Sequence, residues 1–118
     1  MNNIKDYQQQ LSLFAQERDW DEFHSPKNLT MARAGEAGEL LEIFQWLTEK
    51  QSHEIVETEK GRAKIEEEVA DIAIYLLRLC DKLNIDLDAA IAQKIKINEK
   101  KYPVDLAKGN ATKYNERE

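Results

Sequence analysis

Histidine and cysteine are scarce in this chain of 118 residues, which contains two histidines and one cysteine. A structural zinc site takes its ligands mostly from these two residue types, so zinc binding is not favoured. A di-iron bundle is not favoured either, because its sites use Glu-x-x-His pairs and neither His24 nor His53 has that spacing from the paired acids described below. Cys80 cannot form an internal disulfide, which fits a reducing cytoplasm, and we interpret it as a packing residue.

Glycine and proline are also few, at four and two residues, which leaves little turn-forming material for a fold with many strands. The apolar content of 42% is too high for a disordered chain. We therefore expect a single domain over residues 1–118, with a polar tail at 104–118. No apolar run is long enough to cross a bilayer and no signal peptide is recognisable, so we expect a cytoplasmic protein without a membrane partner.

Positive charge is in deficit, because 17 Lys and Arg residues face 23 Asp and Glu residues and the net charge is -6. This balance does not favour a nucleic-acid partner, which needs a basic surface. An acidic protein can still bind a nucleotide when metal ions and a few lysines neutralise the phosphates.

Apolar residues recur at helical spacing and predict an all-α fold, a four-helix bundle. The helices are expected at about residues 4–17, 26–47, 62–83 and 87–101. Ser25 and Pro26 suit the N-cap and first position of the second helix, while Asp86 is the expected cap of the fourth helix and Pro103 ends it. Residues 48–61 are interpreted as a connection with a helical turn in its middle.

The third expected helix is apolar on nearly every side along its middle. Ile65, Val69 and Ile72 follow one stripe, and Ile74 and Leu77 lie on the far side. A helix that is hydrophobic all round is buried all round. In so short a chain this indicates burial by a second subunit, so we expect a homo-oligomer whose interface is formed by helices.

Two pairs of carboxylates lie in the second and third expected helices, Glu36 with Glu39 and Glu68 with Asp71. A spacing of three places both acids of a pair on one helical face. Four acids between two packed helices would repel one another unless a cation lies among them. A cluster of oxygen ligands suits Mg²⁺ or Mn²⁺. The alternative, that all four acids form solvated rims of the bundle, stays open on spacing alone.

Aromatic residues supply candidate contacts for a nucleotide base. Trp46 follows the stripe of the first acidic pair about two to three helical turns further on, at about 5.4 Å per turn, which is roughly the distance from a base to its phosphates. Trp20, Phe23 and Trp46 could stack on a base, or they could simply fill the core. Gly35 and Gly38 each cost about 1 kcal/mol in a helix, and close approach of a backbone or a ligand would explain them.

Lys94, Asn98 and Lys101 share a face of the fourth expected helix. They could neutralise a metal-bound triphosphate and donate hydrogen bonds to it, or they could form an ordinary solvated face. The sequence contains no Gly-rich phosphate loop of the Walker type. Any phosphates would therefore be held by metal and side chains.

Several segments carry a family resemblance when they are taken together. They are Glu17-Arg-Asp-Trp-Asp-Glu-Phe-His24, Gly35-Glu-Ala-Gly-Glu-Leu40, Phe44-Gln-Trp46, Glu67-Glu-Val-Ala-Asp-Ile-Ala-Ile-Tyr75, Lys94-Ile-Lys-Ile-Asn-Glu-Lys-Lys-Tyr-Pro103 and Lys108-Gly-x-Ala-x-Lys-Tyr114. The chain thereby resembles the MazG-like nucleotide pyrophosphohydrolases, which are all-α NTP pyrophosphatases, and in particular their dCTP pyrophosphatase branch. The resemblance covers about residues 11–115.

The resemblance implies hydrolysis of a (deoxy)nucleoside triphosphate, with dCTP or a modified dCTP expected, to the monophosphate and pyrophosphate. This is a house-cleaning reaction of the nucleotide pool. It also implies a dimer or a tetramer. The implied ligands of Mg²⁺, or of Mn²⁺, are Glu36, Glu39, Glu68 and Asp71. The implied substrate contacts are Trp20, Phe23, His24, Trp46, Tyr75, Lys94, Asn98, Lys101 and Tyr102.

In the implied reaction a water attacks the α-phosphorus, and Glu39 or Glu67 takes its proton. One departure concerns Leu11, because the branch can place a polar residue of the first helix at the nucleotide and Leu11 offers no hydrogen bond. The preferred base is therefore not predicted. A broad scavenger of non-standard nucleotides stays a possible alternative, as does a catalytically silent helical interaction module.

Overall fold

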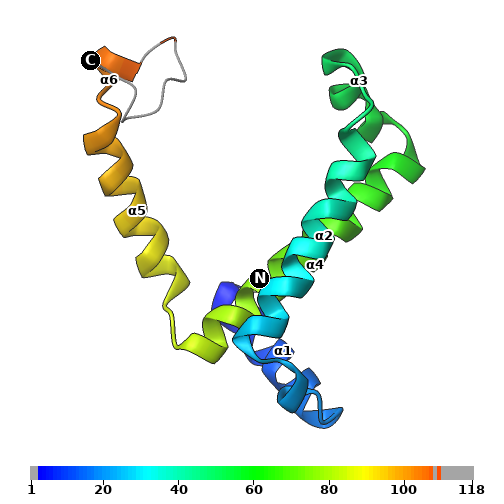
Figure 1. Cartoon of the computed structure of the whole chain (residues 1–118), viewed down its shortest axis with the longest axis vertical. Helices are drawn as coiled ribbons and strands as arrows, with labels where there is room; N and C mark the ends of the chain where they lie inside the picture. The colour runs from blue at the N-terminus through cyan, green and yellow to red at the C-terminus, as the bar shows by residue number, and fades with distance from the viewer. Residues whose placement is uncertain (1–2, 108, 110–118) are drawn as a thin grey trace. The chain divides into compact units, whose positions relative to one another are not determined.

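Among the described residues, 3–107 and 109 of a computed structural model, helices occur and strands do not (Figure 1). This confirms the all-α prediction. The elements, with η for a short 3-10 helix, are α1 (Ile4–Glu17), η1 (Asp21–Phe23), α2 (Pro26–Phe44), α3 (Glu49–Glu54), η2 (Ile55–Glu57), α4 (Glu59–Leu83), α5 (Leu87–Lys101) and α6 (Val104–Ala107). The chain divides after Asn84 into two units. The four-helix bundle and the single domain stay predictions.

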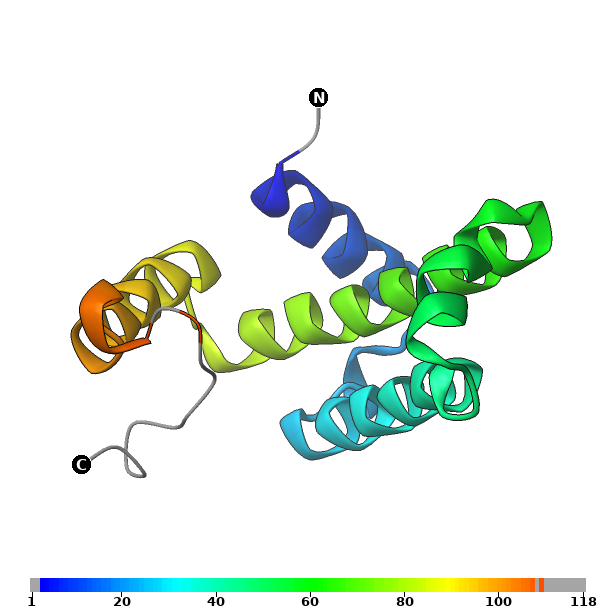
Figure 2. The ribbon, with the colours of Figure 1, turned by 90° about the horizontal axis from the view of Figure 1, so that it is seen from above.

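The first unit is built around α4, the longest of its helices. α2 packs along α4 in the most extensive contact between described elements, and α1 contacts α4 as well. Figure 2 shows α1 and α2 on different sides of α4. Side chains from three separate stretches of sequence therefore meet at one central helix.

The start of α2 is set by local sequence, as predicted. Ser25 Oγ accepts the backbone N–H of Asn28 at 3.1 Å, and Pro26 occupies the first turn. The predicted end at residue 47 is wrong, because α2 ends at Phe44. Thr48 already caps α3, since Thr48 Oγ1 accepts the N–H of Gln51 at 3.1 Å. The helical turn expected within residues 48–61 is confirmed by α3.

The start of α4 lies at Glu59 and not at about residue 62. Thr58 Oγ1 accepts the N–H of Gly61 at 3.0 Å, so Gly61 belongs to the first turn of the helix. A Cβ at Gly61 would collide with the carbonyl oxygen of Ile55 and lie 2.8 Å from Thr58 Oγ1. Glycine is therefore needed where η2 passes close to the beginning of α4.

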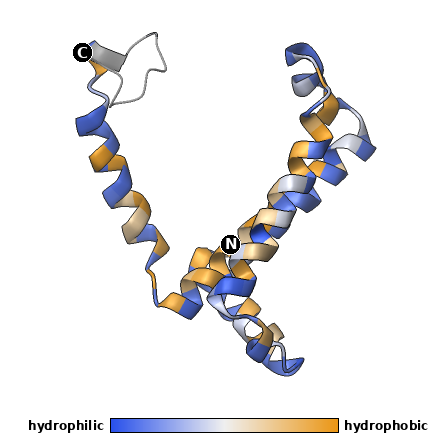
Figure 3. Cartoon of the chain, viewed as in Figure 1, coloured by the Kyte–Doolittle hydropathy of each residue, from blue (hydrophilic) through white to orange (hydrophobic). Residues whose placement is uncertain are grey.

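Burial within the chain is sparse. The buried hydrophobic residues among those described are Ala15, Leu29 and Cys80. Val69 and Ile74 on α4 remain 50% and 38% exposed, so this chain alone does not bury α4 on all sides. Figure 3 shows apolar residues (orange) along both α2 and α4. The predicted burial of the remaining apolar faces of α4 by a second subunit stays a prediction. None of the described helices combines the length and the apolar character required to cross a membrane.

The second unit contains α5, whose bounds agree with the predicted helix. Asp86 is its cap, because Asp86 Oδ1 accepts the N–H of Ala89 at 3.1 Å. The short helix α6 occupies Val104–Ala107, where only a polar tail was expected. The rest of that expected tail, at 108 and 110–118, lies outside the described residues.

Candidate active site

Three of the four acids predicted to bind metal are brought together between α2 and α4. One carboxylate oxygen each from Glu36, Glu39 and Glu68 lies within 4.8 Å of the other two. Glu68 is only 2% exposed, whereas Glu36 is half-buried and Glu39 is exposed. The helical spacing predicted that the two acids of a pair share a face, and the packing of α2 on α4 brings that face to Glu68.

The electrostatics of this acidic cluster (Glu36, Glu39 and Glu68) show that its charges are crowded. A hydrogen bond shared with Glu68, followed by burial and the negative charges of Glu39 and Asp71, raises the pKa of Glu36 to about 7. Glu68 behaves in the opposite way, because its hydrogen bonds to Lys64 and to Glu36 lower its pKa. Lys64 Nζ lies 3.0 Å from Glu68 Oε1. Crowding therefore raises the pKa of Glu36, while the neighbouring Lys64 keeps the pKa of Glu68 low.

Two oxygens of the cluster are buried without a hydrogen-bond partner among the described residues, Glu36 Oε2 and Glu68 Oε2. Leaving a buried acceptor unsatisfied costs about 1–3 kcal/mol, and more when it is charged. Carboxylate oxygens are the ligands preferred by hard divalent cations such as Mg²⁺. The donor set and the unsatisfied oxygens therefore fit a divalent cation.

Asp71 and Glu67 lie outside this cluster. Asp71 is nevertheless close enough for its charge to contribute to the raised pKa of Glu36, and it lines the pocket described next. Glu67 is exposed. Its negative charge contributes to the raised pKa of Lys64, which is due chiefly to Glu68. The ligand role of Asp71 and the proton-accepting role of Glu67 stay predictions.

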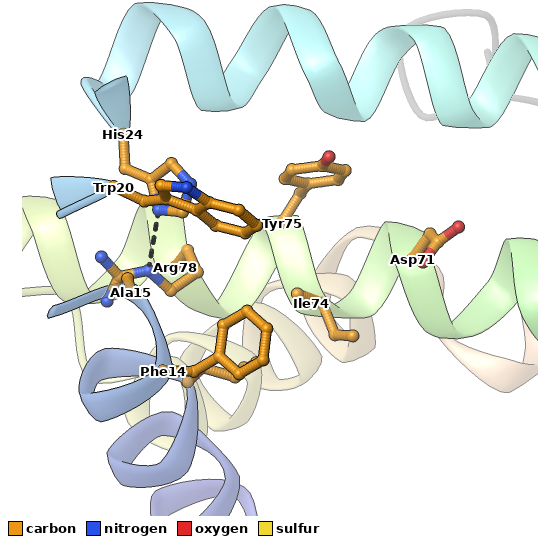
Figure 4. A pocket seen from close by; sticks show the side chains of 9 residues that line it. Phe14, Ala15, Trp20, His24, Asp71, Ile74, Tyr75 and Arg78 are labelled. Carbon is orange, nitrogen blue, oxygen red and sulfur yellow. Dashed lines mark hydrogen bonds between the residues drawn. The ribbon is translucent and has the colours of Figure 1, made fainter. Parts of the chain in front are cut away.

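A pocket of about 280 Å³ is lined by nine residues of the first unit, most of which Figure 4 labels. Leu11, Phe14, Ala15 and Ile74 form its apolar lining, and Trp20, His24, Asp71, Tyr75 and Arg78 complete it. The lining comes from α1, from the segment around η1 and from α4. Because Asp71 is three residues from Glu68 on α4, the pocket adjoins the cluster within about one helical turn.

Aromatic rings follow one another along this pocket. Phe14 meets Trp20 edge to face, with ring centroids 5.6 Å apart, and Trp20 is tilted against His24 at 6.4 Å. The guanidinium carbon of Arg18 lies 3.5 Å from the centre of the Phe14 ring. Phe14 and Trp20 are both 45% exposed, so flat apolar surface remains available beside the acids. Such surface suits an aromatic ligand.

Of the predicted base contacts, Trp20, His24 and Tyr75 line the pocket, whereas Phe23 and Trp46 do not. Phe23 is 61% exposed and Trp46 is 85% exposed. Trp46 lies beyond the end of α2 at Phe44, so the helix that was predicted to carry one stripe from the first acidic pair to Trp46 ends before it. The base-stacking role of both residues stays a prediction.

The predicted phosphate contacts lie beyond Asn84, in the second unit. They are Lys94, Asn98 and Lys101, all on α5, and Tyr102, which caps its C-terminal end. Their role at the phosphates stays a prediction.

Open space surrounds Gly35 and Gly38 on α2. An added Cβ at either glycine would meet no atom within 4 Å. No described backbone of this chain therefore makes the close approach that was one explanation for these glycines. The other explanation, a ligand or a second copy, stays a prediction.

Sequence reasoning missed Arg78, which is 3% exposed at the far wall of the pocket. Its Nη2 lies 2.7 Å from Asp21 Oδ1, and Lys82 Nζ lies 3.0 Å from the same oxygen. Its Nε donates to His24 Nδ1 at 3.3 Å. The available signal was a lone arginine in the apolar part of α4, because a buried charge must find partners.

Comparison with known proteins identifies the family of the chain. A model of the MazG-like family matches residues 31–116. The human protein named dCTP pyrophosphatase 1 is 43% identical over 103 residues, and its mouse counterpart is 44% identical over 101 residues. These matches cover 87% and 86% of this chain, which spans only about 60% of the length of these relatives.

A solved structure is similar over nearly its whole length. The crystal structure of a pyrophosphatase from Archaeoglobus fulgidus superposes with a TM-score of 0.79 at 40% sequence identity. The match covers 87% of this chain and 94% of the archaeal chain. The helical arrangement is therefore shared with a protein that is named a pyrophosphatase.

Proposed function

Because the chain belongs to the MazG-like family, we propose that it hydrolyses a nucleoside triphosphate to the monophosphate and pyrophosphate, with a divalent cation at the acidic cluster. One observation carries this proposal. Glu36 Oε2 and Glu68 Oε2 are buried and lack hydrogen-bond partners among the described residues. A fold that needed these acids only for stability would have satisfied or exposed them.

Glu36, Glu39 and Glu68 would hold the cation, with Asp71 as the proposed fourth ligand. Bound Mg²⁺ polarises phosphate oxygens and makes a water more acidic. A carboxylate that takes the proton of the attacking water must lie within hydrogen-bond reach. Glu39 is better supported for this task than Glu67, because its oxygen lies within the cluster.

The pocket beside the cluster would hold the base. Its volume of about 280 Å³ lies just below the range of about 300–1,000 Å³ for whole small-molecule ligands, so it suits one ring system. Trp20 and Tyr75 offer faces for stacking, typically worth about 1–3 kcal/mol per base. Lys94, Asn98, Lys101 and Tyr102 are proposed phosphate contacts, and Phe23 and Trp46 further base contacts.

dCTP or a modified dCTP is the proposed substrate, because the relatives bear the name dCTP pyrophosphatase 1. Leu11 lines the pocket and contributes no hydrogen bond to a base. This apolar wall does not distinguish cytosine from other bases, so a scavenger of non-standard nucleotides is the alternative that the substrate panel below tests.

A homodimer or homotetramer in the cytoplasm is part of the proposal. Large apolar side chains on the helices of the first unit stay exposed, among them Met31 at 63%, Leu41 at 62% and Val69 at 50%. A second copy would cover such residues and offset the sparse core. Light scattering on the purified protein tests this, and a monomer at micromolar concentration would contradict it.

A panel of natural and modified dNTPs, read by pyrophosphate release with Mg²⁺, with Mn²⁺ and with EDTA, tests the activity. We expect turnover that EDTA abolishes, with a cytosine nucleotide among the best substrates. Turnover of modified nucleotides alone would favour the scavenger. Calorimetric titration of Mg²⁺ into the protein completes the test. If the protein neither binds the metal nor turns over any nucleotide, the alternative that remains is a catalytically silent helical interaction module.

A further inference from the structure

The guanidinium of Arg78 is held from three directions. Asp21 lies 2.7 Å from Nη2, His24 Nδ1 accepts from Nε at 3.3 Å, and Asp81 Oδ2 lies 3.7 Å from Nη1. Asp21 is itself paired with Lys82, and Asp81 Oδ1 accepts from Gln8 Nε2 at 2.9 Å. Figure 4 shows the bond from Arg78 to His24 across the pocket wall. Side chains from α1, η1 and α4 thus lock one orientation of the guanidinium.

The contact with Arg78 decides where His24 carries its proton. A guanidinium stays protonated and can only donate hydrogen bonds. His24 Nδ1 accepts a hydrogen bond from the guanidinium, so Nδ1 carries no proton. The proton of the neutral ring is therefore on Nε2. Burial, together with the positive charges of Arg78 and Lys82, lowers the pKa of His24, while Asp21 acts in the opposite direction. The neutral ring is therefore the form present at neutral pH.

The second nitrogen of His24 is available to a ligand. His24 lines the pocket together with Trp20 and Tyr75, and its Nε2 makes no hydrogen bond with the described residues. The nearby hydrophobic wall, which includes Leu11 and Phe14, offers no competing polar group. The N–H of His24 is thus a polar donor in a mostly apolar pocket.

We propose that Arg78 is a positioning residue that fixes His24 as an Nε2–H donor, and that this donor recognises a hydrogen-bond acceptor on the edge of a pyrimidine base. The proposal rests on the proposed function. It adds that the protein donates this hydrogen bond and the base accepts it. The acceptor would be the 2-carbonyl oxygen or an unprotonated ring nitrogen, and a base without acceptors would gain nothing from His24. The small pocket favours one ring over two.

The first test needs no substrate and uses the full chain. His24 and His53 are the only histidines, so ¹⁵N NMR of histidine-labelled protein gives two sets of signals, with the exposed His53 as the internal control. At pH 7.5 we expect an unprotonated Nδ1 and a protonated Nε2 for His24. In Arg78→Met, which has no N–H donor, we expect a mixture of tautomers resembling that of His53. A wild-type His24 that is doubly protonated, or protonated on Nδ1, would overturn the proposal whether or not the variant folds.

The second test asks whether His24 acts as a hydrogen-bond donor or only as an aromatic ring that fills space. His24→Phe keeps an aromatic ring and removes the N–H. We expect it to raise KM for dCTP about 3- to 10-fold, as expected for one hydrogen bond, with little change in kcat. The matched substrate is a triphosphate whose base is a one-ring isostere without hydrogen-bond acceptors, and its KM should not change.

Arg78→Met should raise KM for dCTP by a similar factor, and adding His24→Phe to it should give little further increase, because both changes remove one interaction. An equal KM increase for dCTP and for the isostere would overturn the donor role. Absence of turnover of every nucleotide would refute the proposed function and the donor role with it. The NMR result does not depend on activity, so the two failures are distinguishable.

Discussion

Two groups of charged residues are centred on the same helix, α4, and they differ in how their buried charges are compensated. At Glu68, acids from α2 and α4 converge, and two buried oxygens have no hydrogen-bond partner among the described residues. At Arg78, opposite charges meet, and the buried guanidinium is satisfied by Asp21 and His24. Asp81 Oδ2 accepts no hydrogen bond there, yet it still lies 3.7 Å from Arg78 Nη1.

The difference separates the proposed metal site from a structural support. Unsatisfied buried acids store an unfavourable energy that a cation can release, so their geometry is complete only with a ligand. A buried ion pair with its partners in place fixes the orientation of the side chains it touches. One group is therefore suited to chemistry, and the other to holding the pocket wall.

Glu68→Gln should have the largest effect, because it removes a proposed metal ligand from the acidic cluster. We expect Mg²⁺-dependent pyrophosphate release to fall by more than about 100-fold, since even partners of a ligand typically contribute 10–100-fold. The fold should survive, because a like charge is removed from a crowded cluster. Glu66→Gln is the matched control, since Glu66 is exposed and pairs only with Arg62 at 3.5 Å. Turnover retained in Glu68→Gln would contradict the metal role.

Arg78→Met should have the largest effect on stability. Removing one partner of a fully buried pair typically costs about 3–5 kcal/mol. The cost here should be smaller, because the Asp21 side chain is 41% exposed and keeps Lys82 as a partner. Thermal or urea unfolding measures the loss. Arg62→Met, in an exposed pair, should cost no more than about 0.5 kcal/mol. A similar cost for both variants would mean that the Arg78 group is not a structural support.

Lys64→Met tests the lysine that forms an ion pair with Glu68 of the acidic cluster. Lys64 occupies an oxygen of Glu68 at 3.0 Å, and its side chain is 54% exposed. Its removal should tighten Mg²⁺ binding about 2- to 5-fold in calorimetry, because the exposed position limits the effect. Lys60→Met, an exposed lysine one turn earlier on α4, is the control. Weaker Mg²⁺ binding in Lys64→Met would show that Lys64 supports the site and does not compete for it.

Asp21→Asn should produce the smallest effect, visible in its pH dependence. The hydrogen bond from Lys82 is the largest cause that lowers the pKa of Asp21, and Arg78 acts in the same direction. The ionised carboxylate therefore stabilises the fold fully above about pH 4, and this contribution is lost as the pH falls from 3.8 through the lower pKa of the folded state.

The stability difference between wild type and Asp21→Asn should accordingly be constant from pH 5 to 8 and shrink below pH 4. It should be modest, because the Asp21 side chain is 41% exposed and solvent screens its charge. Unfolding curves across this range provide the measurement, with the exposed neighbour Glu22→Gln as control. A difference that grows in acid would contradict the assigned pairing.

Features that depend on neighbouring residues in the chain were predictable. The bounds of α1 and α5 agree with the apolar spacing, and the caps Ser25 and Asp86 make the hydrogen bonds that their positions predict. The acidic pairs could be found as well, because a spacing of three always shares a helical face. The end of α2 was missed, since the capping box of Thr48 competes with a helical pattern that runs past Phe44.

Local sequence thus determined the helices, their caps and the acids that share a face, because these depend on interactions over three or four residues. Only the tertiary structure decided that Glu68 joins Glu36 and Glu39, that Trp46 lies outside the pocket, and that Arg78 reaches Asp21 and His24. These contacts join residues far apart in the chain, 54 positions in the case of Arg78 and His24. Helical periodicity carries no information about which faces of two helices will meet.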